Sequence, residues 1–148
     1  MIKKLETIFI FIIVTFLALT VLVKVIGVET KVVLSDSMYP SIKTNDLVYV
    51  YKGINHEHLK VGDVISYRLG NSEVLHRIVE VTDTFITTKG DKNDSNDTPI
   101  RVNEVTGKLI FNLPFGGYLL NLNLWIILIG LYGVIFITRK IVKEFRKG

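Results

Sequence analysis

The sequence contains no cysteine, and this absence excludes several kinds of chemistry. A disulfide framework, a thiolate zinc site and a cysteine nucleophile all require thiol groups. Histidine is also scarce, with three residues in 148, so few side chains could act as a neutral base. At this length we expect one small folded unit besides any membrane segment.

Charged residues are missing from a long run near the start of the chain, which predicts a membrane anchor within residues 1–28. Residues 8–23 are uncharged, and only Lys24 interrupts the apolar run before Val28. About 20 apolar residues cross the hydrocarbon core, and a lysine near one end reaches the interface. A cleaved secretory signal begins in a similar way. The long apolar core and the lack of an Ala-x-Ala site after it favour an uncleaved anchor.

Residues 111–138 carry no charge at all, and they predict a second membrane helix within residues 118–138. Tyr118 and Trp125 lie toward the start of this run, and a basic tail, residues 139–148, follows it. A buried core helix is the alternative. The intervening segment is too small to enclose about 20 apolar residues on all sides, so a span is favoured.

The net charge of +4 is distributed unevenly and favours a membrane over a nucleic-acid partner. Residues 1–28 carry three basic residues and one acid, and residues 118–148 carry five and one. Residues 29–117 carry ten basic residues and twelve acids. Basic excess beside apolar runs is the positive-inside pattern, unlike a basic nucleic-acid face. We therefore expect a multi-pass cell-membrane protein with cytoplasmic termini and residues 29–117 outside.

The outer segment, residues 29–117, predicts a small, mainly β domain flanked by the two helices. Short runs, some alternating between apolar and polar residues, are separated by turn residues. No soluble helix and no internal repeat is expected. In the run 74–81, alternation puts Val74, His76, Ile78 and Glu80 on one face. The expected strands are 31–34, 47–51, 64–68, 74–81, 85–88 and 105–111.

A serine-containing loop opens this domain, with the sequence Leu-Ser-Asp-Ser-Met-Tyr-Pro over residues 34–40. A serine attacks an acyl carbon efficiently when a base takes its proton and donors stabilise the oxyanion. His76, in mid-strand beside Arg77, is one candidate base, although an isolated histidine there is more often a core residue. His56 and His58 flank Glu57 in a loop, with no third metal ligand at a characteristic spacing.

Acidic residues that could orient an imidazole lie in the segment 89–97. This segment also begins like a calcium loop, but Asn96 and Val102 replace the required Gly and Glu. A plain solvated turn is the stronger alternative. No lysine stands where a Ser-Lys dyad would be obvious. Spacing alone does not show that serine, histidine and aspartate meet.

Together these stretches resemble type I signal peptidases of the endoplasmic-reticulum-type branch, which also occurs in archaea and Gram-positive bacteria. The serine box is followed by Asn45-Asp46 where the family usually has Gly-Asp, and Asp36 stands where Gly is common. The resemblance covers the whole outer domain. The matching stretches are 35–40 with 46–48, 62–65, 74–79, 88–93 with Asp97, and the closing segments 107–108 and 114–116.

The resemblance implies a serine endopeptidase that removes signal peptides from exported preproteins. It implies Ser37 as nucleophile, His76 as general base, and Asp97 as the residue orienting His76, supported by Asp91. The Ser37 N–H and the Ser35 hydroxyl would form the oxyanion hole.

The family cuts after small residues, which implies shallow apolar pockets near Met38, and it needs no metal or organic cofactor. Accessory subunits are left open. Two other classes compete. One is a self-cleaving repressor-type relative, which would need a DNA-binding domain; the other is a catalytically silent, membrane-anchored β module that binds a partner protein.

Overall fold

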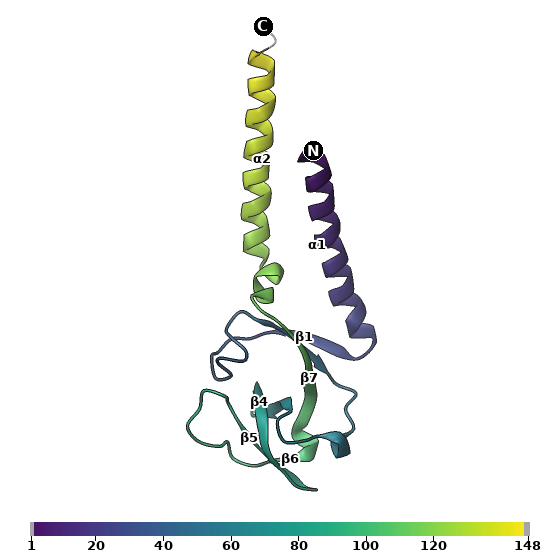
Figure 1. Cartoon of the computed structure of the whole chain (residues 1–148), viewed down its shortest axis with the longest axis vertical. Helices are drawn as coiled ribbons and strands as arrows, with labels where there is room; N and C mark the ends of the chain where they lie inside the picture. The colour runs from purple at the N-terminus through teal and green to yellow at the C-terminus, as the bar shows by residue number, and fades with distance from the viewer. Residues whose placement is uncertain (1, 147–148) are drawn as a thin grey trace.

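The computed structural model describes residues 2–146, and two long helices lie on the same side of a β domain (Figure 1). Helix α1 is Ile2–Val25 and helix α2 is Leu122–Phe145. By length and composition both could cross a membrane, with a mean hydropathy of 2.8 in the most apolar 18 residues of Glu6–Val25 and of 1.9 in those of Leu122–Phe145. The predicted fold class, a mainly β domain flanked by two apolar helices, is confirmed.

The β domain is one antiparallel sheet with the strand order β1-β2-β7-β3-β4-β5-β6. Three short 3-10 turns, η1 (His56–His58), η2 (Val102–Glu104) and η3 (Gly116–Leu120), complete it. Between Val28 and Asn121 the structure has no α-helix, as the sequence predicted. The strands are β1 (Val28–Val32), β2 (Leu47–Tyr51), β3 (Val64–Leu69), β4 (Ser72–Val81), β5 (Phe85–Lys89), β6 (Ile100–Arg101) and β7 (Val105–Leu113).

The strand predictions need three corrections. The first strand begins at Val28 and ends at Val32, so Leu34 lies outside it and is 87% exposed. The short strand β6 was not predicted. In β4 the register shifts between Ile78 and Glu80, and Val81, not Glu80, packs against the core that contains Ile78. Such a bulge adds one residue and thereby reverses the alternation beyond it.

Two apolar clusters form the core. The residues of the first cluster come mainly from the β3–β6 half of the sheet, while the second holds the serine loop against β2 and β3. Burying side chains of this kind contributes about 1.5–3 kcal/mol each. The first contains Leu59, Ile65, Tyr67, Ile78, Ile86, Ile100 and Val105, and the second contains Met38, Ile42, Val48, Val50 and Val64.

A polar cluster joins the distant strands β1 and β4. The Glu73 carboxylate on β4 accepts hydrogen bonds from the hydroxyls of Ser66 (2.5 Å) and Thr106 (2.7 Å) and pairs with the Lys31 ammonium on β1. Burial would raise the pKa of Glu73, but the bonds from Lys31, Ser66 and Thr106 outweigh it and lower the pKa to about 2. The cluster therefore links strands that are not neighbours in the sheet.

The segment before α2 is fixed to the turn that follows the serine loop. The buried Asp46 carboxylate accepts hydrogen bonds from the Lys43 N–H (2.9 Å), the Asn112 amide (3.1 Å) and the Phe115 N–H (3.0 Å). The Gly117 N–H donates to the Asn45 carbonyl (2.9 Å). Asn45 has a positive φ of 67°, a conformation that asparagine tolerates better than most residues. The base of α2 thus supports the loop that carries Ser37.

Candidate active site

The serine loop is held in place by contacts on both sides of Ser37. The Asp36 carboxylate accepts hydrogen bonds from the backbone N–H of Thr44 (3.0 Å) and from its hydroxyl (2.8 Å), and these bonds lower the pKa of Asp36. Met38 is 2% exposed and belongs to the second core cluster, so its side chain does not line an open surface. Ser37 itself is half-buried between these two anchors.

His76 and Asp97 form a direct pair. His76 is 8% exposed in β4, and its Nδ1 lies 2.6 Å from Asp97 Oδ2. The same carboxylate oxygen accepts hydrogen bonds from the hydroxyls of Thr88 (2.7 Å) and Tyr67 (3.3 Å). A carboxylate accepting from Nδ1–H leaves the Nε2 lone pair of a neutral imidazole free to take a proton. The pair has the form of a positioned base.

The second acidic candidate, Asp91, binds the neighbouring arginine instead of the histidine. Arg77 Nε lies 2.8 Å from Asp91 Oδ1, and Arg77 Nη2 lies 2.8 Å from Asp91 Oδ2. The third nitrogen, Nη1, donates to the Gly62 carbonyl at 2.9 Å. These bonds lower the pKa of Asp91 and raise that of Arg77. A bidentate pair fixes both position and orientation. Of the two acids, Asp97 therefore contacts His76, and Asp91 joins β4 to the loop after β5.

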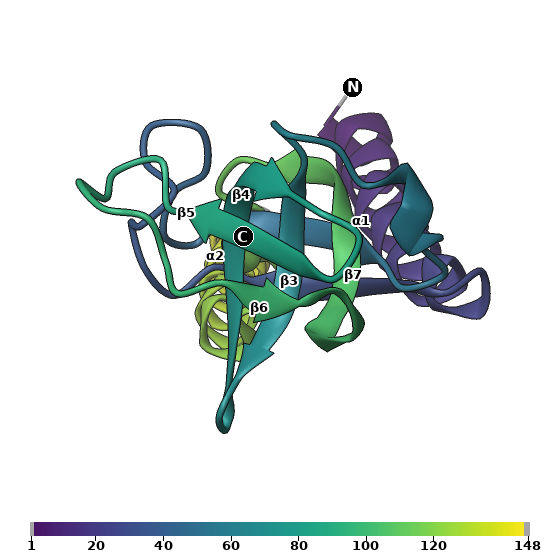
Figure 2. The ribbon, with the colours of Figure 1, turned by 90° about the horizontal axis from the view of Figure 1, so that it is seen from below.

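The loop after β5 also contacts the serine loop directly. The Lys92 N–H donates to the Ser37 carbonyl at 2.9 Å. At Gly90 a Cβ atom would lie 2.7 Å from the same oxygen, so a side chain there has no room. Seen from below, the two loops lie on the same side of the sheet (Figure 2). Ser37 is thereby tied to a loop that Arg77, the residue after His76, also binds.

The Ser37 hydroxyl has one recorded hydrogen-bond neighbour, the Ser35 hydroxyl at 3.4 Å. In the described part of the chain, residues 2–146, Ser37 and His76 form no hydrogen bond with each other. In free enzymes the bond between nucleophile and base is often long and tightens when substrate binds. The structure thus brings Ser35 and Ser37 into contact, and His76 and Asp97 into contact, while Asp91 binds Arg77.

Two residues of this site were not predicted to take part in it. Tyr67 and Thr88 are buried and both donate to Asp97. Burial raises the pKa of Tyr67, and the neighbouring Asp97 charge adds to this effect. Thr88 precedes the Lys-Gly-Asp stretch and could have been noticed there, but nothing in the spacing of Tyr67 indicated a partner 30 residues away. His56 and His58 lie apart from the site in the exposed turn η1.

The fold and this site define a class of protein, namely a β domain that is carried on two apolar helices and holds a serine loop and a His–Asp pair. Comparison with known proteins gives the family. The family model described as signal peptidase, peptidase S26, matches residues 4–109. The chain belongs to this signal peptidase family.

Similar proteins carry a consistent name. The chain is 30% identical over 131 residues to the signal peptidase complex catalytic subunit SEC11 of Leptosphaeria maculans, with 74% of each chain covered. It is 28% identical over 128 residues to the protein of that name from Neurospora crassa, again with 74% of each chain covered. A shorter match to the Lachancea thermotolerans protein is 38% identical over 77 residues. These relatives are fungal, and they support the type I family without distinguishing its archaeal and Gram-positive members.

Proposed function

We propose that this chain is a membrane-bound serine endopeptidase of the Ser-His-Asp type that cleaves signal peptides from exported preproteins after small residues. The observation that carries the proposal is the 2.6 Å contact between His76 Nδ1 and Asp97 Oδ2. A carboxylate beside Nδ1 favours the tautomer that carries the proton there and leaves Nε2 free to act as a base.

In the proposed mechanism, Ser37 Oγ attacks the scissile carbonyl while His76 Nε2 takes its proton. The tetrahedral intermediate collapses to an acyl-enzyme when the protonated His76 donates that proton to the leaving amine. Water, deprotonated by the same imidazole, then hydrolyses the ester. Asp97 holds the imidazole and stabilises its protonated form, so we assign it as a positioning residue.

We assign stabilisation of the oxyanion to two hydrogen-bond donors in the serine loop, the Ser37 N–H and the Ser35 hydroxyl. The 3.4 Å separation of the Ser35 and Ser37 hydroxyl oxygens supports this assignment. Each such donor contributes roughly 3 kcal/mol to transition-state stabilisation. Asp91 supports the site through Arg77, since this pair connects the strand of His76 to the loop that binds the Ser37 carbonyl. The chemistry needs no metal or organic cofactor.

We propose that residues 1–28 anchor the chain, residues 29–117 form an extracytoplasmic catalytic domain, residues 118–138 cross the membrane again and residues 139–148 are cytoplasmic. The apolar lengths of α1 and α2 and the basic residues near their far ends support this arrangement. Anchoring would raise the effective concentration of a substrate whose own signal segment lies in the bilayer. The relatives are named subunits of a complex, which supports the expectation of accessory subunits.

The test uses the purified full-length protein in lipid and a preprotein with alanine at positions −1 and −3. We expect one cut after the −1 residue, identified by mass spectrometry of the product. A preprotein with tyrosine at −1 should resist cleavage, and Ser37→Ala should cut neither. Cleavage at other sites, or by Ser37→Ala, would contradict the proposal. A folded but inert wild type would favour the partner-binding module, unless added membrane extract restores the cut.

A further inference from the structure

The end of α2 farthest from the β domain carries a cluster of basic side chains that the peptidase chemistry does not use. The cluster consists of Arg139, Lys140 and Lys143 in the last two turns of α2 and of Arg146, the residue that caps its C-terminus, and all four are exposed. At 1.5 Å per residue, Arg139 and Lys143 lie about 26 and 32 Å along α2 from Leu122. This is the depth at which the headgroups of a bilayer about 30 Å thick begin.

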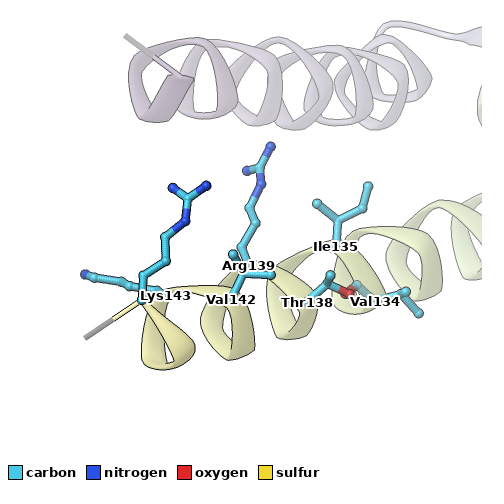
Figure 3. Close-up of a pocket in the computed structure, with 7 residues that line it drawn as sticks. Val134, Ile135, Thr138, Arg139, Val142 and Lys143 are labelled. Carbon is cyan, nitrogen blue, oxygen red and sulfur yellow. The ribbon is translucent and has the colours of Figure 1, made fainter. Parts of the chain in front are cut away.

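Two adjoining hollows lie beside these residues, with volumes of about 540 and 710 Å³. Ile135, Arg139 and Lys143 line both of them, and Glu6 of α1 lines the larger. Figure 3 shows Ile135 and Arg139 extending from α2 toward α1. The hollows combine an apolar wall at the depth of acyl chains with cations at the depth of headgroups.

The charge at this end exceeds what the chain itself neutralises. Arg139 and Glu6 approach to 3.9 Å, which is a long ion pair between exposed groups and is worth little. Against these four cations, the described part of the chain offers two acids at this level, Glu6 and Glu144. Basic pockets between membrane helices at the cytoplasmic side bind anionic lipid headgroups.

We propose that these hollows, which share Ile135, Arg139 and Lys143 of α2 and reach Glu6 of α1, bind one anionic phospholipid. Its phosphate would contact Arg139 and Lys143, and an acyl chain would lie along Ile135. The proposal rests on the membrane placement given above but not on peptidase activity. Near a membrane surface each cation changes lipid affinity about fivefold, so losing both should cost roughly 25-fold.

The test is native mass spectrometry of the full-length protein released from detergent that contains equal amounts of phosphatidylglycerol and phosphatidylcholine. We expect the wild type to retain one phosphatidylglycerol in preference to phosphatidylcholine. Arg139→Gln combined with Lys143→Gln should lose this preference. Lys60→Gln combined with Arg68→Gln, which removes the same charge from the β domain, should keep it.

Two further variants separate a defined site from general attraction to basic residues. Lys4→Gln removes one positive charge from the same end of α1 and should change lipid retention much less than Arg139→Gln. Glu6→Gln removes the acid beside Arg139 and should increase retention. Equal retention of the two lipids by the wild type, or an equal loss in Lys4→Gln and Arg139→Gln, would overturn the proposal.

Discussion

Replacing Asp97 by asparagine tests how the imidazole is held. Asp97 Oδ2 lies 2.6 Å from His76 Nδ1 and also accepts from Thr88 at 2.7 Å. Asparagine keeps the size of the side chain but can present an N–H to Nδ1, which favours the tautomer with the proton on Nε2. In serine-protease triads this exchange lowers kcat about 10⁴-fold, or about 5.4 kcal/mol. We expect a loss of about 10³- to 10⁴-fold here.

The matched control is Asp91→Asn, because Asp91 binds Arg77 rather than His76. Loosening that pair displaces the loop behind Ser37, and a displacement of about 1 Å costs about 10²-fold. Both rates would be measured as single-turnover cleavage of a preprotein in lipid, with folding checked by circular dichroism. The reasoning is refuted if Asp97→Asn stays within tenfold of wild type, or if Asp91→Asn is the slower of the two.

Three further predictions follow from other contacts. Gly90→Ala should reduce the cleavage rate about 10²-fold, because its Cβ would lie 2.7 Å from the Ser37 carbonyl oxygen. Gly130→Ala is the control and should leave the rate unchanged, because its Cβ would have nothing within 4 Å. Equal rates for the two variants would count against Ser37 as the nucleophile. The wild-type rate should fall as the solution is made acidic, because a protonated imidazole cannot accept the serine proton. A rate that does not change with pH would exclude histidine as the base. The pKa of Glu73 is lowered to about 2, below its value of about 4.3 in an unfolded chain, so its stabilisation is present above pH 4.3 and lost as pH falls toward 2. In denaturant titrations the stability deficit of Glu73→Gln should therefore shrink from pH 5 to pH 2, and a constant deficit would contradict this.

Much of the architecture could be predicted because its signals are local. The two uncharged runs predicted both helices. The alternating runs predicted six of the strands, with bounds within three residues of those in the structure. β6 could not be predicted because two residues show no periodicity. The bulge in β4 depends on how β4 pairs with β5, which no single run reveals. For the same reason the strand order, with β7 between β2 and β3, was out of reach.

The site was predictable in its residues but not in its pairing. Asp91 and Asp97 lie six positions apart in one loop, and both suited a histidine partner. The choice between them depends on where Arg77 points, and its bidentate contact with Asp91 leaves Asp97 for His76. The hydroxyls of Tyr67 and Thr88 reach Asp97 only because β3, β4 and β5 are neighbours in the sheet.

The central claim is that Ser37 and His76 act as one catalytic unit. The most direct measurement compares cleavage of a preprotein by wild type, Ser37→Ala, His76→Ala and the double variant, all as folded full-length protein in lipid. Residues that act as a unit are not additive, so each single variant should fall to the same residual rate and the double variant should be no slower. A His76→Ala variant that cleaves at the wild-type rate, or a double variant much slower than either single one, would contradict the account.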